Sequence, residues 1–390
     1  MTEPGGGRVL RRAGHQYDTH AGLIEPSRPP TPSAGAGLDA IIVPAARPAK
    51  NLQTAVGLAT ETGARLIVLC SLRAHADEAR ALLAEHRLPD AAAVEIPHQC
   101  GGWPLGDFET TRWLVGAGKA ACGARSSDLS LKRNTGLLLA RMLGWDRIFF
   151  LDDDIRWISA DAVLSTVSLL GAAGHGYRTA GMSVKDYPDN SVVCHARREV
   201  GEKQGVFVSG SVLAVDCRAP FGFFPDLYNE DWLFFHRDAA EGRLATPGSL
   251  AEQLPYDPFG DPQRAAGQEF GDVIAEGLYA LLHSGLRAEA ANEKYWERFL
   301  DDRSRVLEVV RQRLPFARPH KRKKISRSIG AAQQMLWTIT PQMCADYVAA
   351  WQRDLERWAG VLAGLGAASS IEDALRRLGL RQESDWPSTR

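Results

Sequence analysis

Short apolar runs alternate with amphipathic segments through the first half of the chain. The runs are apolar on both faces, which predicts buried β-strands, and the segments between them repeat their apolar residues at helical spacing. The predicted strands are residues 38–44, 64–70, 93–96 and 147–151, and the predicted helices are residues 52–62, 74–86 and 131–143. This alternation is typical of a mostly parallel sheet that helices cover on both sides. We therefore expect an α/β, Rossmann-like fold.

The pattern changes in the second half and at the N-terminus. Residues 191–195 and 206–215 predict further strands, and from about residue 262 the pattern is nearly all helical. The first 37 residues are rich in Gly, Pro, Arg and Ser and have nothing periodic to bury. We expect a disordered tail whose removal leaves stability nearly unchanged. The predicted organisation is a tail (1–37), an α/β domain (38–260) and a helical C-terminal region (261–390).

Composition narrows the class of protein. With 390 residues, of which 45% are hydrophobic, the chain can bury a substantial core, and a net charge of −1 argues against a nucleic-acid partner. The six cysteines form no CxxC pair, so neither a zinc cage nor a disulfide framework is indicated, and a reducing cytoplasm is the expected location. No apolar run is long enough to predict a transmembrane segment. Oligomeric state is not predicted.

Two features of the C-terminal region have more than one interpretation. The basic run 318–324 could be a solvated loop, or it could contact a diphosphate, a phosphorylated acceptor or an anionic membrane surface, so peripheral membrane contact is possible. Trp337, Trp351 and Trp358 recur at spacings that fit helix faces. Helix packing is the default interpretation of these tryptophans, and sugar stacking is the alternative.

Three adjacent carboxylates directly follow the apolar strand 147–151. In open α/β sheets ligands bind at the carboxyl ends of the strands, which is where Asp152, Asp153 and Asp154 lie. Adjacent like charges are unfavourable unless a cation or solvent relieves them. Side-chain alternation places Asp152 and Asp154 on one side, which would form an oxygen-rich clamp for Mg²⁺ or Mn²⁺. The alternative is a solvated acidic turn before a helix at residues 160–170.

A basic helix start precedes this strand. Taken alone, Lys132 and Arg133 would be solvated side chains at the beginning of helix 131–143. A helix that begins beside a diphosphate site can instead supply cationic side chains and the positive end of its dipole. Arg47, which follows the first predicted strand, is a further candidate for substrate binding.

These motifs together resemble a known family. One passage begins with Lys132-Arg133-Asn134-Thr135-Gly136, continues through a helix and a strand, and ends with Asp152-Asp153-Asp154. It resembles the ARN-x-G to DxD passage of family 2 type glycosyltransferases. Gly210 lies in a segment that resembles their small-residue strand near donor and acceptor, and residues 229–232 resemble their ED motif. The resemblance covers about residues 38–236.

The resemblance implies a GT-A catalytic domain over residues 38–260 that transfers a sugar, expected to be a hexose, from a nucleotide-sugar to a hydroxyl of a small-molecule or glycan acceptor. Asp152 and Asp154 would hold Mn²⁺ or Mg²⁺. Asp231 would be the general base of an inverting reaction, with Glu230 the second choice. The other implied donor or acceptor contacts are Lys132, Arg133, Asn134, Asp153 and Gly210. His283 is the available third metal ligand, although a lone helical histidine is more often structural.

Several alternatives stay open. Glu230 and Asp231 could simply be an acidic pair at a helix N-terminus. The second strand ends in Leu69-Cys70-Ser71, where relatives often have an acidic residue, so the nucleotide base is not predicted. A nucleotidyltransferase is disfavoured because residues 44–48 contain neither glycine nor lysine. A non-catalytic nucleotide-sugar or glycan-binding protein is mildly disfavoured by the intact acidic motifs.

Overall fold

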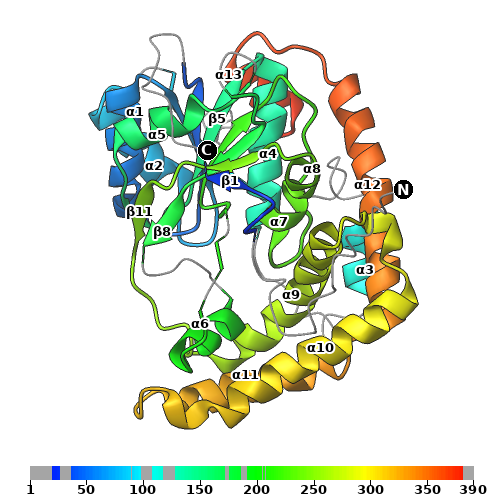
Figure 1. Cartoon of the computed structure of the whole chain (residues 1–390). Helices are drawn as coiled ribbons and strands as arrows, with labels where there is room; N and C mark the ends of the chain where they lie inside the picture. The colour runs from blue at the N-terminus through cyan, green and yellow to red at the C-terminus, as the bar shows by residue number, and fades with distance from the viewer. Residues whose placement is uncertain are drawn as a thin grey trace, which may run out of the picture.

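The centre of the computed structural model is an eight-stranded, mostly parallel sheet (Figure 1). The structure describes residues 20–26, 37–88, 90–97, 108–116, 128–171, 175–185, 191–203, 205–206 and 208–380. In spatial order the strands are β1 (Glu25–Pro26), β10 (Leu244–Thr246), β7 (Thr179–Gly181), β9 (Val212–Asp216), β5 (Arg147–Leu151), β2 (Ala40–Ala45), β3 (Arg65–Cys70) and β4 (Ala92–Glu95). Among these described strands, only β9 is antiparallel to its neighbours, β5 and β7.

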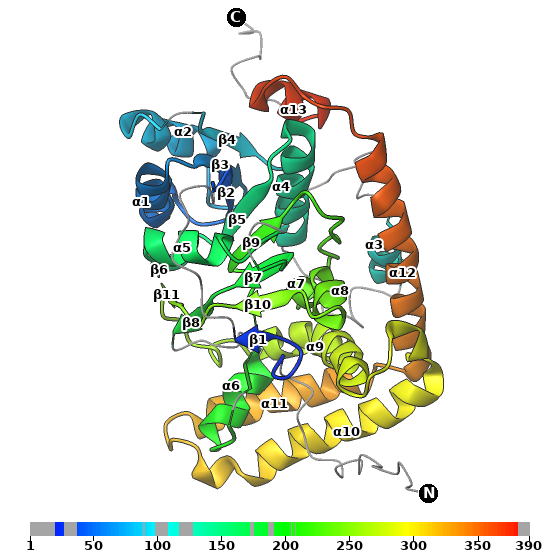
Figure 2. The same ribbon diagram turned by 45° about the horizontal axis from the view of Figure 1, so that its top comes forward.

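Each central strand buries both of its faces. Ile41 and Phe149 pack into one hydrophobic core, whereas the next residues, Ile42 and Phe150, pack into the other. One core contains the helices α1 (Gln53–Thr62), α2 (Ala76–Glu85) and α5 (Ala160–Val167), and the other contains α4 (Leu129–Leu143), α7 (Glu230–Phe234) and α8 (His236–Ala240). Figure 2 shows these two groups on opposite sides of the sheet. The predicted α/β class with helices on both faces is confirmed.

The C-terminal region is helical, as predicted, and packs onto the α4 side of the sheet. Its helices are α9 (Pro262–His283), α10 (Glu293–Gln312), α11 (Arg322–Leu336), α12 (Pro341–Gly364) and α13 (Ile371–Arg377). Short helix α3 (Glu109–Gly116) lies against α12. Trp296 and Trp358 share one hydrophobic core with Phe150 of the sheet. The helical region is therefore packed continuously with the α/β part.

The tryptophans of this region divide into two kinds. Trp351 and Trp358 are buried, so helix packing explains their spacing, whereas Trp337 is 73% exposed. Among the described residues no helix is long and apolar enough to cross a membrane.

A second, three-stranded sheet lies beside the end of β5. It consists of β6 (Ile155–Trp157), β11 (Leu250–Gln253) and β8 (Ser183–Lys185). The backbone N–H of Leu254 donates to the carbonyl of Asp154 at 2.8 Å, which ties the end of β11 to the acidic cluster.

Two predicted strands differ from the structure. Residues 191–195 belong to helix α6 (Val192–Glu199), which packs against α9 and α11. A short apolar run fits a buried helix as well as a buried strand, and here the packing of three helices decides. In the segment 206–215 the strand begins only at Val212, because Gly210 forms a turn.

The predicted boundary of the N-terminal tail is also wrong. Residues 1–19 lie outside the described part, but residues 20–26 are docked, and β1 extends the sheet beside β10. His20 is fully buried, its ring lies 4.2 Å from that of Trp232 and 4.6 Å from that of Tyr279, and its Nδ1 accepts from the N–H of Val208 at 2.9 Å. The buried ring of His20 therefore anchors residues 20–26, although the composition of the first 37 residues predicts nothing to bury.

Replacing His20 by alanine should therefore destabilise the protein, by about 2–4 kcal/mol, because it leaves a cavity and an unpaired buried N–H. Denaturant unfolding would measure the loss, and His75→Ala, which changes an exposed histidine, is the matched control. Equal stability of the two variants would show that residues 20–26 do not contribute to the core.

Candidate functional site

Two small pockets meet at the carboxyl ends of the parallel strands. Each has a volume of about 210 Å³, and they share Leu129 and Asp152. The first is also lined by Arg133, Asp154, Val208, Ser209, Ser211, Tyr228, Asn229, Glu230, Asp231, Trp232 and Gln253. The second is also lined by Pro44, Ala46, Arg47, Leu72, Asp128, Lys132 and Asp153. The fold thus brings the three predicted motifs into one acidic cleft.

Asp153 joins the acidic cluster to the end of β2. Its Oδ2 accepts from the backbone N–H groups of Ala46 and Arg47, both at 2.7 Å, and the Arg47 guanidinium also bonds to its Oδ1. These charge-assisted bonds use the buried Asp153 carboxylate to fix the backbone around Arg47. Asp153 therefore holds the end of β2 beside the acidic cluster, while Asp152 and Asp154 line the first pocket.

Arg133 connects the first and last acidic motifs. Its Nη1 donates to Glu230 Oε1 at 2.7 Å, and its Nη2 donates to Asp152 Oδ1 at 3.0 Å. Only 3% of the Arg133 side chain is exposed. Burial nevertheless raises the pKa of Asp152 to about 7, even though Arg133 opposes the shift. The charge of a cation in the cleft would offset this effect and favour the ionised form of Asp152.

Asp154 has one engaged oxygen and one free oxygen. Its Oδ2 accepts from Arg47 Nη2 at 3.0 Å and from Gln253 Nε2 at 2.9 Å. Its Oδ1 and the Gln253 Oε1 are buried without a hydrogen-bond partner among the described residues. Burial raises the pKa of Asp154, against the attraction of Arg47. Gln253 has no signal in the sequence, because nothing in its short strand distinguishes it from a surface glutamine.

The donor set fits a divalent cation that also takes oxygens from a substrate. No cluster of three or more His, Cys, Asp or Glu in the described chain could hold a metal by itself. Mg²⁺ commonly uses only one or two carboxylates and completes its shell with phosphate oxygens and water. Asp152, Asp154 and the amide oxygen of Gln253 line the same pocket and can supply such a partial shell.

Lys132 and Asn134 hold protein elements together. Lys132 donates to the Ala45 carbonyl at 2.6 Å, the Ser71 hydroxyl at 2.5 Å and Asp128 at 3.0 Å. An ammonium group has three donors, so none remains for a diphosphate. Asn134 exchanges two hydrogen bonds with the backbone of Phe224, at 2.7 and 2.8 Å. The structure therefore gives these two residues protein partners in place of the expected contact with a substrate.

Asp231 lines the same pocket as Asp152 and Asp154. Its Oδ2 accepts from the Gly210 N–H at 2.7 Å, and its Oδ1 accepts from the Trp232 N–H at 2.9 Å. A Cβ at residue 210 would lie 2.8 Å from both Arg133 Nη1 and Asp231 Cβ, so glycine is required there. Burial and repulsion from Glu230 raise the pKa of Asp231 to about 6. Glu230 itself is engaged by Arg133.

The turn before Asp231 is fixed by the helical region. Asn229 has a left-handed backbone (φ 62°), and its Nδ2 donates to Asp272 Oδ1 on α9 at 2.9 Å. Asp272 also accepts from Arg303 of α10 at 2.8 Å, and Arg303 bonds at the same distance to the carboxylates of Glu269 and Glu276. A buried network thus runs from two C-terminal helices to the start of α7.

Substitutions at Asn229 should separate its backbone role from its hydrogen bond. Asn229→Gly keeps the left-handed conformation and loses only the bond to Asp272, whereas Asn229→Ala loses both. We expect the alanine variant to be less stable than the glycine variant by about 1–2 kcal/mol, because a left-handed backbone is unfavourable for a residue with a Cβ. Denaturant midpoints would show this; indistinguishable midpoints would mean that the turn relaxes.

Two other predicted candidates lie away from the cleft. His283 ends α9 and is not among the residues that line either pocket, so the structure does not bring it to Asp152 and Asp154. In the basic run, Lys321 bonds to Glu199 at 2.7 Å, and Lys324 bonds to Asp257 at 2.7 Å. These cations are used in surface ion pairs and do not line the acidic cleft.

Comparison with known proteins does not assign the chain to a family. No protein-family model matches the sequence, and no curated protein matches it.

Proposed function

We propose that this protein is a metal-dependent glycosyltransferase of the GT-A type, which moves a sugar from a nucleotide-sugar donor to an acceptor hydroxyl. The observation that carries the proposal is the meeting of Asp152, Asp154 and Asp231 in one pocket, although 77 residues separate the last two along the chain. Two neighbouring carboxylates, of which Asp154 has an oxygen without a partner among the described residues, suit a cation. A separate carboxylate of raised pKa, Asp231, suits proton transfer.

The donor would bind at the carboxyl ends of β2 and β5. When bound, Mn²⁺ or Mg²⁺ would neutralise the charge that develops on the leaving diphosphate. Asp152, Asp154 and Gln253 would hold it. The Arg47 side chain is 37% exposed, whereas only 1% of the Lys132 side chain is exposed. Of these two cations of the second pocket, Arg47 is therefore the one that can turn from the carboxylates to a phosphate oxygen.

The acceptor hydroxyl would lie beside Asp231. Each Asp231 oxygen accepts one backbone N–H and keeps a further lone pair, so the carboxylate can accept a proton from a hydroxyl that the pocket orients. The two N–H bonds hold the carboxylate in place during the transfer. A general base of this kind belongs to an inverting reaction. Glu230 is less suited to act as the base because its carboxylate is paired with Arg133.

A thermal-shift screen would test the proposal and name the donor. The full chain would be heated with uridine, guanosine, adenosine and thymidine diphosphates and their sugar conjugates, each with Mn²⁺ or with EDTA. A ligand that binds only the folded state stabilises it, by about 2.7 kcal/mol when its concentration is 100 times Kd. The melting temperature rises as a result. We expect one nucleotide series to act only with Mn²⁺. If no nucleotide shifts the transition under either condition, the proposal fails.

A further inference from the structure

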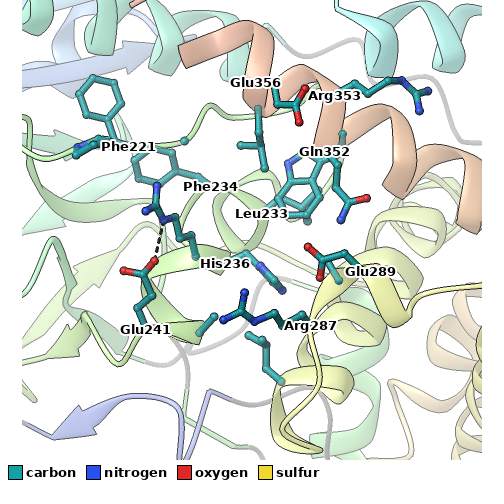
Figure 3. Close-up of a pocket in the computed structure, with 18 of the residues that line it drawn as sticks. Phe221, Leu233, Phe234, His236, Glu241, Arg287, Glu289, Gln352, Arg353 and Glu356 are labelled. Carbon is teal, nitrogen blue, oxygen red and sulfur yellow. Dashed lines mark hydrogen bonds and ion pairs between the residues drawn. The ribbon is translucent and has the colours of Figure 1, made fainter. Parts of the chain in front are cut away.

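One corner of the helical region carries an excess of positive charge. The chain as a whole has a net charge of −1. A cavity of about 950 Å³ beside α8 and α12 (Figure 3) shows the same balance, because its charged lining residues are Arg237, Arg287, Arg353, Glu241, Glu289 and Glu356. Residues 309–340, by contrast, contain eight arginines and lysines and no aspartate or glutamate. These cations all lie between residues 311 and 327, where α10 ends and α11 begins.

Neighbouring carboxylates offset only part of this charge. Glu199, at the end of α6, pairs with both Arg318 and Lys321. No ion pair of Arg322, Lys323 or Arg327 is found among the described residues. Ion pairs between exposed side chains are weak and are screened by salt. The corner therefore keeps a clear positive excess.

A buried histidine beside this corner reports the same positive potential. Burial lowers the pKa of His195 to about 4, and the positive charges of Arg198, Lys321 and Arg264 contribute further to the shift. The negative charge of Glu199 opposes the shift but does not reverse it. Cations from α6, from the start of α9 and from the start of α11 therefore act on one region.

The positive charge does not stabilise α11 itself. The first turn of this helix contains Arg322, Lys323 and Lys324 and no acidic residue, and the N-cap, Lys321, makes no side-chain cap. Cations at the positive end of a helix dipole are unfavourable. Local choices that weaken an element are expected mainly where a protein performs a function. The cluster of cations therefore points to an anionic partner.

Two exposed aromatic side chains lie at the two ends of this basic segment. Phe316 is 76% exposed and Trp337 is 73% exposed, more than any other large apolar side chain among the described residues. Arg322 fixes the loop around Phe316, because its guanidinium donates to the carbonyls of Ala317 at 2.9 Å and Pro315 at 2.6 Å. The loop is thus held in a conformation that leaves the Phe316 ring in solvent beside the cations.

One face of α11 runs from the cations to the second ring. Lys323, Arg327, Gln334 and Trp337 follow one another at steps of four, seven and three residues, so they lie on one side of the helix. All four are exposed, whereas the other side of α11 packs against α9 and α10. The exposed face is about 21 Å long from Lys323 to Trp337.

We propose that this face, together with Phe316, docks onto the surface of an anionic lipid bilayer. Lipid headgroups of negative charge attract clustered Lys and Arg, and aromatic rings favour the boundary between headgroups and acyl chains. A bilayer is a continuous surface, so Phe316 and Trp337 can enter it together although α11 separates them. A single-stranded nucleic acid would instead need aromatic rings interleaved with the cations, and no Phe, Tyr or Trp lies between these two. The docking surface stands whether or not the chain transfers a sugar.

Sedimentation of the full chain with vesicles would test this surface. The vesicles would contain phosphatidylcholine alone, or phosphatidylcholine with about 30% phosphatidylglycerol. We expect binding to the anionic vesicles in about 50 mM NaCl, little binding in about 500 mM NaCl, and none to the neutral vesicles. Lys323→Glu combined with Arg327→Glu should weaken the binding at least about thirtyfold, because each cation near an anionic surface contributes about fivefold.

The two rings have separate tests. Phe316→Ser and Trp337→Ser should each weaken binding to the anionic vesicles severalfold, because the apolar area that enters the membrane contributes to affinity. Lipids that are brominated on their acyl chains quench only tryptophans that enter the bilayer. Binding to such vesicles should therefore quench part of the wild-type fluorescence, and Trp337→Phe should remove this quenching.

Lys50→Glu combined with Arg87→Glu is the matched control. It reverses one exposed lysine and one exposed arginine beside α1 and α2, which lie at the opposite end of the molecule from α11 (Figures 1 and 2), so it should bind like the wild type. An equal loss of binding in this control would show that net charge alone decides. That result, no binding to anionic vesicles at low salt, or binding to poly(uridylic acid) without binding to vesicles would each overturn the proposal.

Discussion

Asp154→Asn should reduce sugar transfer by on the order of a thousandfold while leaving the fold intact. The amide preserves the volume and can still accept from Arg47 and Gln253, but it loses the charge that a divalent cation needs. A bound metal contributes several kcal/mol to such a reaction, and each 1.36 kcal/mol is tenfold in rate. Initial rates with Mn²⁺, together with circular dichroism, would measure both effects.

Gln263→Glu would serve as the control, because it also exchanges an amide and a carboxylate, but at the exposed start of α9. It should leave transfer unchanged. The Asp154 variant should also bind the donor more weakly, because the metal bridges protein and diphosphate. Near-normal transfer by a folded Asp154→Asn enzyme would place the metal elsewhere or remove it from the mechanism.

Asp231→Asn should have a different signature. General-base catalysis contributes about 10²–10⁴ in rate, so kcat should fall by this factor while donor affinity changes little. The wild-type rate should also fall as the pH drops below about 6, because burial raises the pKa of Asp231 to about 6 and the base must be ionised to accept a proton. The variant should lack this limb of the pH profile.

Rates and donor affinity over pH 5–8 would separate the two roles. If Asp231→Asn weakens donor binding as strongly as Asp154→Asn does and leaves the saturated rate unchanged, then Asp231 is a binding residue. The inverting mechanism would then be wrong.

The parts of the site that adjacent residues form could be predicted from the sequence. Asp152, Asp153 and Asp154 follow a buried strand, and strand geometry alone places them at the ligand-binding edge of the sheet. Arg133 was expected near the cleft because its helix precedes that strand. Its actual partners, Asp152 and Glu230, could not be predicted, because the contact with Glu230 spans 97 residues.

Contacts formed by distant residues left no local signal. Gln253 reaches Asp154 across 99 residues, and Asp272 reaches Asn229 from a helix whose pattern shows only that it is a helix. The sequence suggests a solvated Lys132 because it does not show that Ala45, which ends β2, and Ser71, which follows β3, lie beside this side chain. The sequence places His20 in the tail because a single histidine does not change the polar composition of the first 37 residues.

Calorimetric titration of the wild-type chain with the nucleoside diphosphate from the thermal screen tests the central claim most directly. The titration would be made once with Mn²⁺ and once with EDTA, and repeated on Asp154→Asn. We predict saturable binding to the wild type with Mn²⁺, and binding at least about a hundredfold weaker in EDTA and in the variant. Equal affinity with and without the metal would contradict the assignment of Asp152 and Asp154 as a diphosphate-bound cation site.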